Sequence, residues 1–179
     1  MDVGAGAGNA STRRFGRGMI IAAWLTVLAL LTFIFHSYLD RRENPNRNPE
    51  SRIGEAGVKE VILKRNPSGH YVAGGEINGS RVTFLLDTGA TDVAISESLA
   101  NKLRLRRGAA RISRTANGNV RSWNTILDNV KLGSIHLNGV RASILPTMNA
   151  GEVLLGMSFL KQLKLVQRGN LLTLRQYQN

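Results

Sequence analysis

One aspartate in this sequence stands where a carboxylate could act as an acid or a base. Asp87 follows the apolar residues Phe84-Leu85-Leu86 and precedes Thr88-Gly89-Ala90. A carboxylate directly after an apolar strand is costly to bury unless a nearby group uses it. The small residues after Asp87 let the main chain turn sharply and let a second chain or a substrate approach closely. The pattern therefore indicates acid–base chemistry at a tight turn.

Hydrolysis by carboxylates needs a second acid beside the first. One acid acts as a base on a water molecule, and the other donates a proton to the bond that breaks. Two carboxylates that close cannot both be ionised, so they share a proton. From residue 58 onward the only aspartates are Asp87, Asp92 and Asp128. We expect Asp92 to be a cap or a solvated loop residue, and Asp128 lacks a Thr-Gly context. A symmetric homodimer, which places Asp87 beside its own copy, supplies the second acid.

The composition argues against other kinds of active site. The chain has no cysteine, which excludes thiol catalysis, disulfides and Cys-based metal centres. Its three histidines, at positions 36, 70 and 136, follow no ligand spacing, so we predict no metal and no cofactor. Ser158 lacks the second glycine of a nucleophile elbow, which disfavours serine hydrolysis.

The charge balance is strongly basic, with a formal net charge of +12. From Ile53 to the end of the sequence, 17 Lys and Arg stand against 8 Asp and Glu. The densest cluster comprises Lys102, Arg104, Arg106, Arg107, Arg111 and Arg114. Such a cluster attracts anionic lipid or nucleic acid, or it forms a solvated face. Since no aromatic interleaving or nucleic-acid motif accompanies it, we favour a solvated face or a membrane-surface role and expect no nucleic acid.

The N-terminal part divides into three segments. Residues 1–18 are rich in Gly, Ala, Ser and Arg and predict a disordered tail. Met19–Phe35 is 17 residues without a charge, and extension to Leu39 predicts a transmembrane anchor at 19–39. A cleaved signal peptide is the rival interpretation, but the apolar run is long and no small-x-small site precedes Asp40. The polar residues 40–57, with two prolines, predict a linker.

Residues 58–179 alternate short apolar segments with turn signals, which predicts a mostly β domain with closed or sandwich-like strand packing. Strands are expected at 58–65, 70–77, 81–86, 110–115, 120–126, 134–137 and 140–145, with two more around Gly169-Asn170. Hairpin turns are expected at Asn78-Gly79, Asn117-Gly118 and Asn138-Gly139. Short helices are expected from Ser96, as the N-cap, to Leu103 and at 158–163.

Two motifs resemble those of a known family. Asp87-Thr88-Gly89-Ala90 resembles the catalytic motif of retropepsin-like aspartic proteases, and it occurs once. Val153-Leu154-Leu155-Gly156 resembles the family's downstream motif, which runs into a helix. Together with Thr115-Ala116-Asn117-Gly118, residues 154–160 resemble a bacterial, membrane-anchored group. The resemblance covers residues 58–175 and implies a small closed β-barrel-like domain with one or two short helices, preceded by a single transmembrane helix.

The resemblance also implies roles for individual residues. Asp87 would carry the catalytic carboxylate, Thr88 would lock the two active-site loops of a dimer, and Gly89 would offer its main chain to substrate. The hairpin at 115–123 would be the mobile flap, with Thr115, Ala116, Asn117 and Gly118 at its tip. Leu154, Leu155 and Gly156 would form the second motif. Retroviral members have an ion pair where this sequence has Thr91 and Met157, which implies a different dimer strength and substrate preference.

The sequence thus predicts a membrane-anchored homodimeric aspartic endopeptidase that acts on protein or peptide substrates. Its N-terminal helix would contact membrane lipid. With the resemblance, the short basic tail places the anchor in an inner membrane and the domain in the periplasm. One alternative is a non-catalytic module of the same fold that dimerises or binds peptides on a membrane anchor. Another is a basic anchor protein that binds lipid or nucleic acid.

Overall fold

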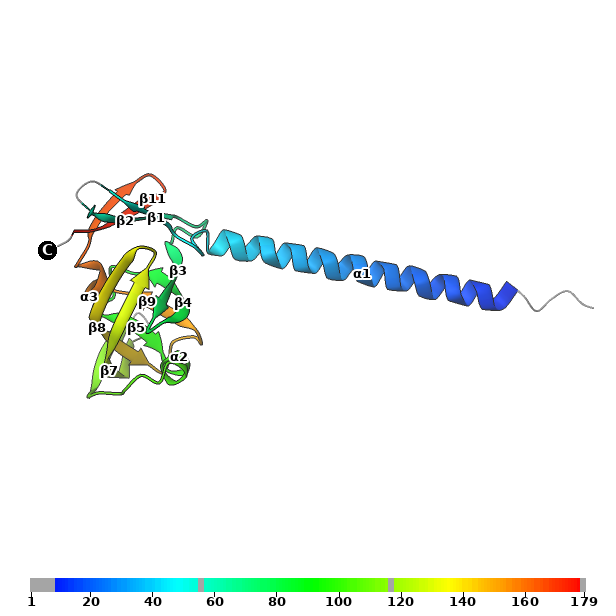
Figure 1. The fold of residues 1–179 in the computed structure, drawn as a ribbon. Helices are drawn as coiled ribbons and strands as arrows, with labels where there is room; N and C mark the ends of the chain where they lie inside the picture. Colours follow the sequence, from blue (N-terminus) through cyan, green and yellow to red (C-terminus); the bar gives the residue numbers. More distant parts are fainter. Residues whose placement is uncertain (1–8, 55–56, 116–117, 178–179) are drawn as a thin grey trace, which may run out of the picture. The chain divides into compact units, whose positions relative to one another are not determined.

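The computed structural model describes residues 9–54, 57–115 and 118–177. The chain divides into two compact units, Met1–Arg41 and Arg42–Asn179. Most of the first unit belongs to one continuous helix, α1 (Asn9–Glu43) (Figure 1). The helix begins inside the segment predicted as a disordered tail and continues past Leu39, while the anchor bounds of 19–39 stay a prediction.

From Gly18 onward α1 is long and apolar enough to cross a membrane, with a mean hydropathy of 2.4 in its most apolar stretch. Its hydroxyl groups are satisfied within the helix. The Oγ1 atoms of Thr26 and Thr32 donate to the carbonyl oxygens of Ala22 and Leu28, at 2.9 and 2.8 Å. These bonds remove two free donors from an otherwise apolar surface, as a lipid environment requires.

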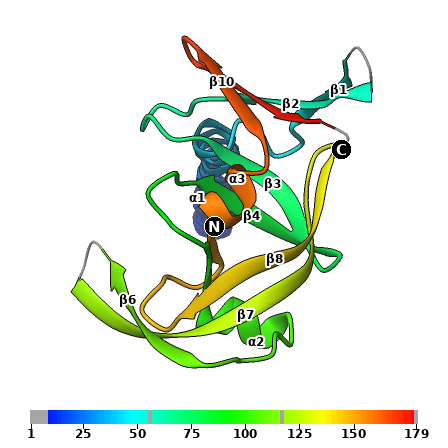
Figure 2. The ribbon, with the colours of Figure 1, turned by 90° about the vertical axis from the view of Figure 1, so that its left-hand side faces the viewer.

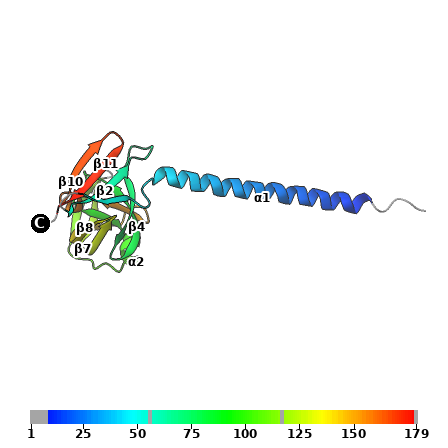
Figure 3. The same cartoon turned by 45° about the horizontal axis from the view of Figure 1, so that its top comes forward.

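The second unit contains two β-sheets. The smaller sheet is antiparallel and has the strand order β1 (Glu50–Ile53), β2 (Lys59–Lys64), β11 (Leu171–Gln176) and β10 (Lys164–Arg168) (Figure 3). The larger sheet has the order β3 (Val72–Ile77), β4 (Ser80–Leu86), β9 (Glu152–Leu155), β5 (Val93–Ser96), β8 (Ile135–Leu145), β7 (Gly118–Leu132) and β6 (Ala110–Thr115).

The larger sheet curls on itself because β3 also pairs with β7. Glu76 opposes Lys131, and Ile77 opposes Val130, in an antiparallel ladder. The strands from β3 to β7 therefore form a ring, while β6 continues beyond it alongside one end of β7 (Figure 2). The ring surrounds an apolar core whose largest buried side chains include Phe84, Ile95, Leu127, Ile144, Leu155 and Phe159. The mostly β fold predicted from the turn-punctuated sequence is confirmed.

Local signals placed most elements correctly. The first hairpin turns at Asn78 and Gly79, whose φ angles of 48° and 76° are those that an Asn-Gly turn favours. Helix α2 (Glu97–Lys102) is capped by Ser96, whose Oγ accepts from the amide of Leu99. Helix α3 (Met157–Leu160) begins one residue before the predicted one and ends three residues earlier.

The third predicted hairpin was wrong. β8 runs through Asn138-Gly139 as one strand, and the chain turns instead at Gly133-Ser134, since Leu132 opposes Ile135. The buried residues change phase along β8, from 135 and 137 to 140, 142 and 144. The same change occurs in β7, between Leu127 and Val130. Gly139, with φ of 63°, therefore marks a local change of face within a paired strand rather than a turn.

The segment predicted as a linker is partly structured. It contains β1, which pairs with β2, and an isolated bridge between Asn46 and Ala73. Asn46 is 5% exposed, and the polar composition of this stretch did not predict that burial. Residues 55 and 56 of this segment lie outside the described residues.

Candidate active site

Parallel pairing of β4 with β9 brings the two sequence motifs together. Leu86 opposes Leu155 at the ends of these strands. Asp87 and Gly156 therefore leave adjacent strands at the same edge of the sheet, and the amide of Asp87 donates to the carbonyl oxygen of Leu155 at 3.2 Å. Both motifs can be recognised in the sequence, but only the pairing of β4 with β9 makes them neighbours.

The loop after Asp87 is a tight turn closed by its own carboxylate. The amide of Gly89 donates to Oδ1 of Asp87 at 2.9 Å, and the amide of Ala90 donates to the Asp87 carbonyl oxygen at 3.3 Å. No described residue makes a hydrogen bond to Oδ2 of Asp87. The Asp87 side chain is half-buried, while Thr88 and Gly89 are exposed. The turn thus fixes the carboxylate while leaving one of its oxygens open to another molecule.

The main chain of the loop after Asp87 passes very close to Gly156. A Cβ atom at this position would lie 2.2 Å from the carbonyl oxygen of Asp92 and 2.7 Å from that of Ala90. The first turn of α3 then holds the loop, because the amides of Met157 and Ser158 donate to the carbonyl oxygens of Ala90 and Thr91 at 2.8 and 2.9 Å. The second motif therefore supports the loop through main-chain contacts that need a glycine.

Ser158 is a buried structural residue. Its Oγ accepts from the amide of Val93 at 3.0 Å and donates to the carbonyl oxygen of Arg141 at 2.7 Å. The hydroxyl thus ties α3 to β5 and β8. Both of its polar contacts are to main chain, which agrees with the interpretation that Ser158 is no nucleophile.

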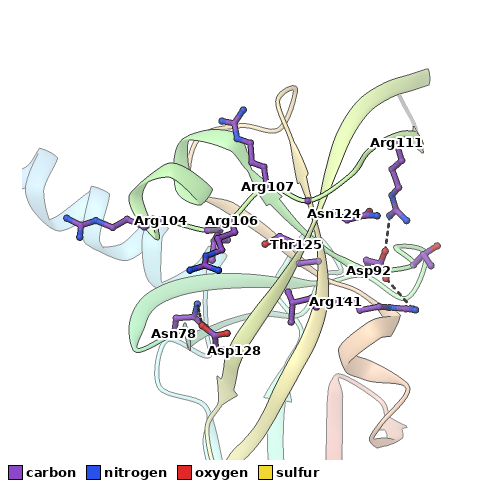
Figure 4. Close-up of a pocket in the computed structure, with 15 residues that line it drawn as sticks. Asn78, Asp92, Arg104, Arg106, Arg107, Arg111, Asn124, Thr125, Asp128 and Arg141 are labelled. Atoms are coloured by element: carbon purple, nitrogen blue, oxygen red, sulfur yellow. Dashed lines mark hydrogen bonds and ion pairs between the residues drawn. The ribbon is translucent and has the colours of Figure 1, made fainter.

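Asp92 is buried and ion-paired, contrary to the expectation of a cap or a solvated residue. Nη2 of Arg111, from β6, lies 2.8 Å from its Oδ2, and Nη2 of Arg141, from β8, lies 3.5 Å from its Oδ1. Figure 4 shows both guanidinium groups pointing at this carboxylate. Arg111 also donates to Oγ of Ser143 at 2.7 Å. Sequence reasoning missed Arg141 and Ser143, since neither shares a motif with Asp92.

A cavity of about 1040 Å³ lies beside this ion pair and not at Asp87. Its lining comprises Asn78, Thr91, Asp92, Arg104–Gly108, Arg111, Asn124–Ile126, Asp128, Arg141 and Ala142. The arginines of the sequence cluster do not converge in it. Arg106 points toward the Asn78–Asp128 pair, whereas Arg104 and Arg107 point away (Figure 4). Asp87 is not among the residues that line this cavity.

The hairpin expected to be the flap is formed by β6 and β7. The two strands pair from Ala110 opposite Trp123 to Thr115 opposite Gly118. Ala116, Asn117 and the side chain of Thr115 lie outside the described residues. At the base of the hairpin, Arg107 stacks on Trp123 at 4.8 Å and pairs with Glu97 at 2.7 Å. The hairpin is thus attached to α2 at its base.

Across the described ranges, no three His, Cys, Asp or Glu side chains lie close enough together to hold a metal ion. The chemistry available at the site is that of a carboxylate at an exposed turn.

Comparison with known proteins identifies the family. The family model "gag-polyprotein putative aspartyl protease" matches residues 73–162, which include the Asp87 loop, the hairpin of β6 and β7, and the second motif. The chain belongs to the retropepsin-like aspartic protease family. This confirms the resemblance drawn from the two motifs.

Proteins similar to this retropepsin-like chain include two curated relatives and a solved structure. An uncharacterized Sinorhizobium protein is 31% identical over 170 residues, or 88% of this chain and 72% of the relative. An uncharacterized Rickettsia prowazekii protein is 32% identical over 110 residues, or 60% of this chain and 47% of the relative. The crystal structure of a retropepsin-like aspartic protease from Rickettsia conorii aligns over 71% of this chain and 94% of its own, with a TM-score of 0.55 and 26% identity.

Proposed function

We propose that this retropepsin-like protein is a membrane-anchored, homodimeric aspartic endopeptidase. Asp87 and its copy in a second subunit would share a proton across the two-fold axis, because two adjacent carboxylates cannot both be ionised. The ionised carboxylate takes a proton from a water molecule, which attacks the carbonyl carbon of the peptide bond. The protonated carboxyl donates its proton to the carbonyl oxygen, which gives a tetrahedral diol. The carboxyl that took the proton from water then donates it to the leaving nitrogen as the C–N bond breaks, and the other carboxylate takes a proton back from the diol.

The observation that carries this proposal is the geometry of the Asp87 turn. Main-chain bonds from Asp87 to Leu155 and from Met157 to Ala90 hold the turn against the second motif. The exposed side of the turn, Thr88 and Gly89, is free to meet a second copy. We assign Thr88 to the contact between the two loops, and Gly89 to the contact with substrate.

The apolar part of α1 supports the anchoring. We place this anchor in an inner membrane with the domain on the periplasmic side, as the resemblance to bacterial membrane-anchored members implies. Two chains held in one bilayer have a raised effective concentration, so a weak interface suffices for pairing. Digestion of the domain by external protease in spheroplasts, but not in intact cells, is the result that this orientation requires.

The test is peptide cleavage by the full chain in detergent, with a peptide library as substrate. Asp87→Asn should reduce turnover at least 100-fold and leave the thermal unfolding midpoint unchanged, because Asn keeps the oxygen that accepts from Gly89. Asp128→Asn, an exposed aspartate on β7, is the matched control and should keep its turnover. An aspartic-protease inhibitor should block the wild type.

Full turnover by Asp87→Asn would contradict the proposal. A wild-type protein that dimerises and binds peptides without cleaving any of them would instead indicate the non-catalytic module of the same fold.

A further inference from the structure

The chain just after α1 is fixed to the domain by a buried asparagine. Nδ2 of Asn46 donates to the carbonyl oxygens of Lys64 and Val72 at 2.9 and 2.7 Å, and its Oδ1 accepts from the amide of Lys64 at 2.6 Å. Both the nitrogen and the oxygen of the Asn46 side-chain amide are therefore hydrogen-bonded, and the residue is 5% exposed. A buried amide with every partner in place holds its segment rigidly.

The main chain around Asn46 is fixed as well. The amide of Gly74 donates to the Asn46 carbonyl oxygen at 2.8 Å. A Cβ atom at Gly74 would lie 2.1 Å from the carbonyl oxygen of Arg47, so the two backbones touch. On the other side, Nδ2 of Asn66 donates to the carbonyl oxygen of Glu43, the last residue of α1, at 3.1 Å. Only Asn44 and Pro45 lie between these two fixed points.

The connection between the apolar helix and the domain is therefore very short. From Leu39 to Glu43 the helix rises about 6 Å, and the three steps to Asn46 add at most about 11 Å. A free linker over residues 40–57, as its composition predicts, would extend up to about 60 Å. The folded unit has a diameter of about 40 Å at this chain length. Every part of the domain then stays within about 60 Å of the hydrocarbon region.

We infer that the substrates of this protease are membrane-proximal segments of other membrane-bound proteins, within about 60 Å of the bilayer. The inference rests on the proposed function, since it takes the anchor to be in a membrane and Asp87 to cleave peptides. A catalytic turn on so short a connection cannot reach cleavage sites far from the surface. It meets sites close to the bilayer at a high effective concentration.

The experiment measures cleavage against distance from the membrane. The full chain is reconstituted in phosphatidylcholine vesicles with a single-span reporter that carries a peptide cleaved in the library assay. Helical spacers of 10 or 80 residues place that peptide about 15 or about 120 Å from the bilayer. We expect the near site to be cleaved at least 10-fold faster than the far site. The free peptide, measured in parallel, reports the catalytic activity itself.

A longer connection should reduce this selectivity. Insertion of 40 Gly and Ser residues between Glu43 and Asn44 should reduce the near-to-far ratio at least threefold, while the same insertion before residue 9 should leave the ratio unchanged. A separate measurement addresses the fixed segment. Asn46→Ala should speed hydrogen exchange at the amide of Lys64, and the exposed Asn48→Ala should not.

The outcomes separate the inference from the function beneath it. Equal cleavage of near and far sites by the wild type, with the free peptide also cleaved, would overturn the inference alone. Unchanged exchange at Lys64 in Asn46→Ala would overturn the role given to this asparagine. A free peptide that stays intact would overturn the proposed function, and the inference with it.

Discussion

The carboxylate of Asp92 lies 2.8 Å from Nη2 of Arg111, and this ion pair joins the loop after Asp87 to β6. The Asp92 side chain is 8% exposed and that of Arg111 is 40% exposed. The other oxygen of Asp92 has an ion pair with Arg141 but no hydrogen bond within the described residues. The loop that carries Asp87 and the hairpin of β6 and β7 are therefore linked through one buried carboxylate.

Arg111→Ala should lower the free energy of unfolding by about 2 kcal/mol, because it leaves the buried Asp92 with only the more distant Arg141. Urea unfolding measures this loss. Arg168→Ala, an exposed arginine on β10, is the control and should change stability by less than about 0.5 kcal/mol. Equal losses of unfolding free energy in the two variants would show that the ion pair of Asp92 with Arg111 does not stabilise the domain.

Gly156→Ala should both destabilise the domain and impair catalysis. The added Cβ meets two carbonyl oxygens of the active-site loop, neither of which can move without shifting the turn. We expect a loss of about 2–3 kcal/mol in urea unfolding and a fall in kcat for the folded fraction. In Gly54→Ala, whose Cβ makes only ordinary contacts at 3.5 Å or more, both quantities should stay near wild type. Wild-type stability in Gly156→Ala would refute this reading of the contact.

Arg104→Gly should stabilise the domain. Arg104 follows α2 with φ of 53°, and it donates to Asn101 while Leu105 donates to Ala100, which is the hydrogen-bond pattern of a Schellman motif. Glycine adopts this conformation without strain, so we expect a gain of about 0.5–1 kcal/mol.

The control for Arg104→Gly is Arg106→Gly, which removes the same side chain at a position without a positive φ. The midpoint of thermal unfolding should rise in Arg104→Gly and stay level or fall in Arg106→Gly. The same shift in both variants would mean that charge removal, and not backbone strain, sets the effect.

Ser158→Ala should lower the free energy of unfolding by about 1–3 kcal/mol, because the amide of Val93 and the carbonyl oxygen of Arg141 lose their shared buried partner. Turnover per folded molecule should persist, which is the reverse of the expectation for Asp87→Asn. Ser68→Ala, at an exposed turn, serves as the control and should leave the unfolding midpoint unchanged. Complete loss of turnover in a well-folded Ser158→Ala would mean that the hydroxyl has a chemical role.

Local sequence signals succeeded where the structure follows from neighbouring residues. The Asn78-Gly79 turn, the Ser96 cap and the strand that delivers Asp87 are all set by φ preferences, short side chains or apolar runs. The identical dipeptide Asn138-Gly139 failed as a turn because pairing of β7 with β8 overrides the local preference. The residues on both sides of this dipeptide gain more stability from continuous pairing with β7 than from a second reversal of the chain.

The sequence by itself determined the family, through Asp87-Thr88-Gly89 and Leu154-Leu155-Gly156, and it determined the apolar length of the helix. Tertiary structure alone decided that Asp87 and Gly156 are neighbours, that Asp92 is buried between Arg111 and Arg141, and that Asn46 fixes the supposed linker. The reason is physical. Backbone preference and hydrophobic period are properties of adjacent residues, whereas burial and charge pairing depend on which distant strands come together.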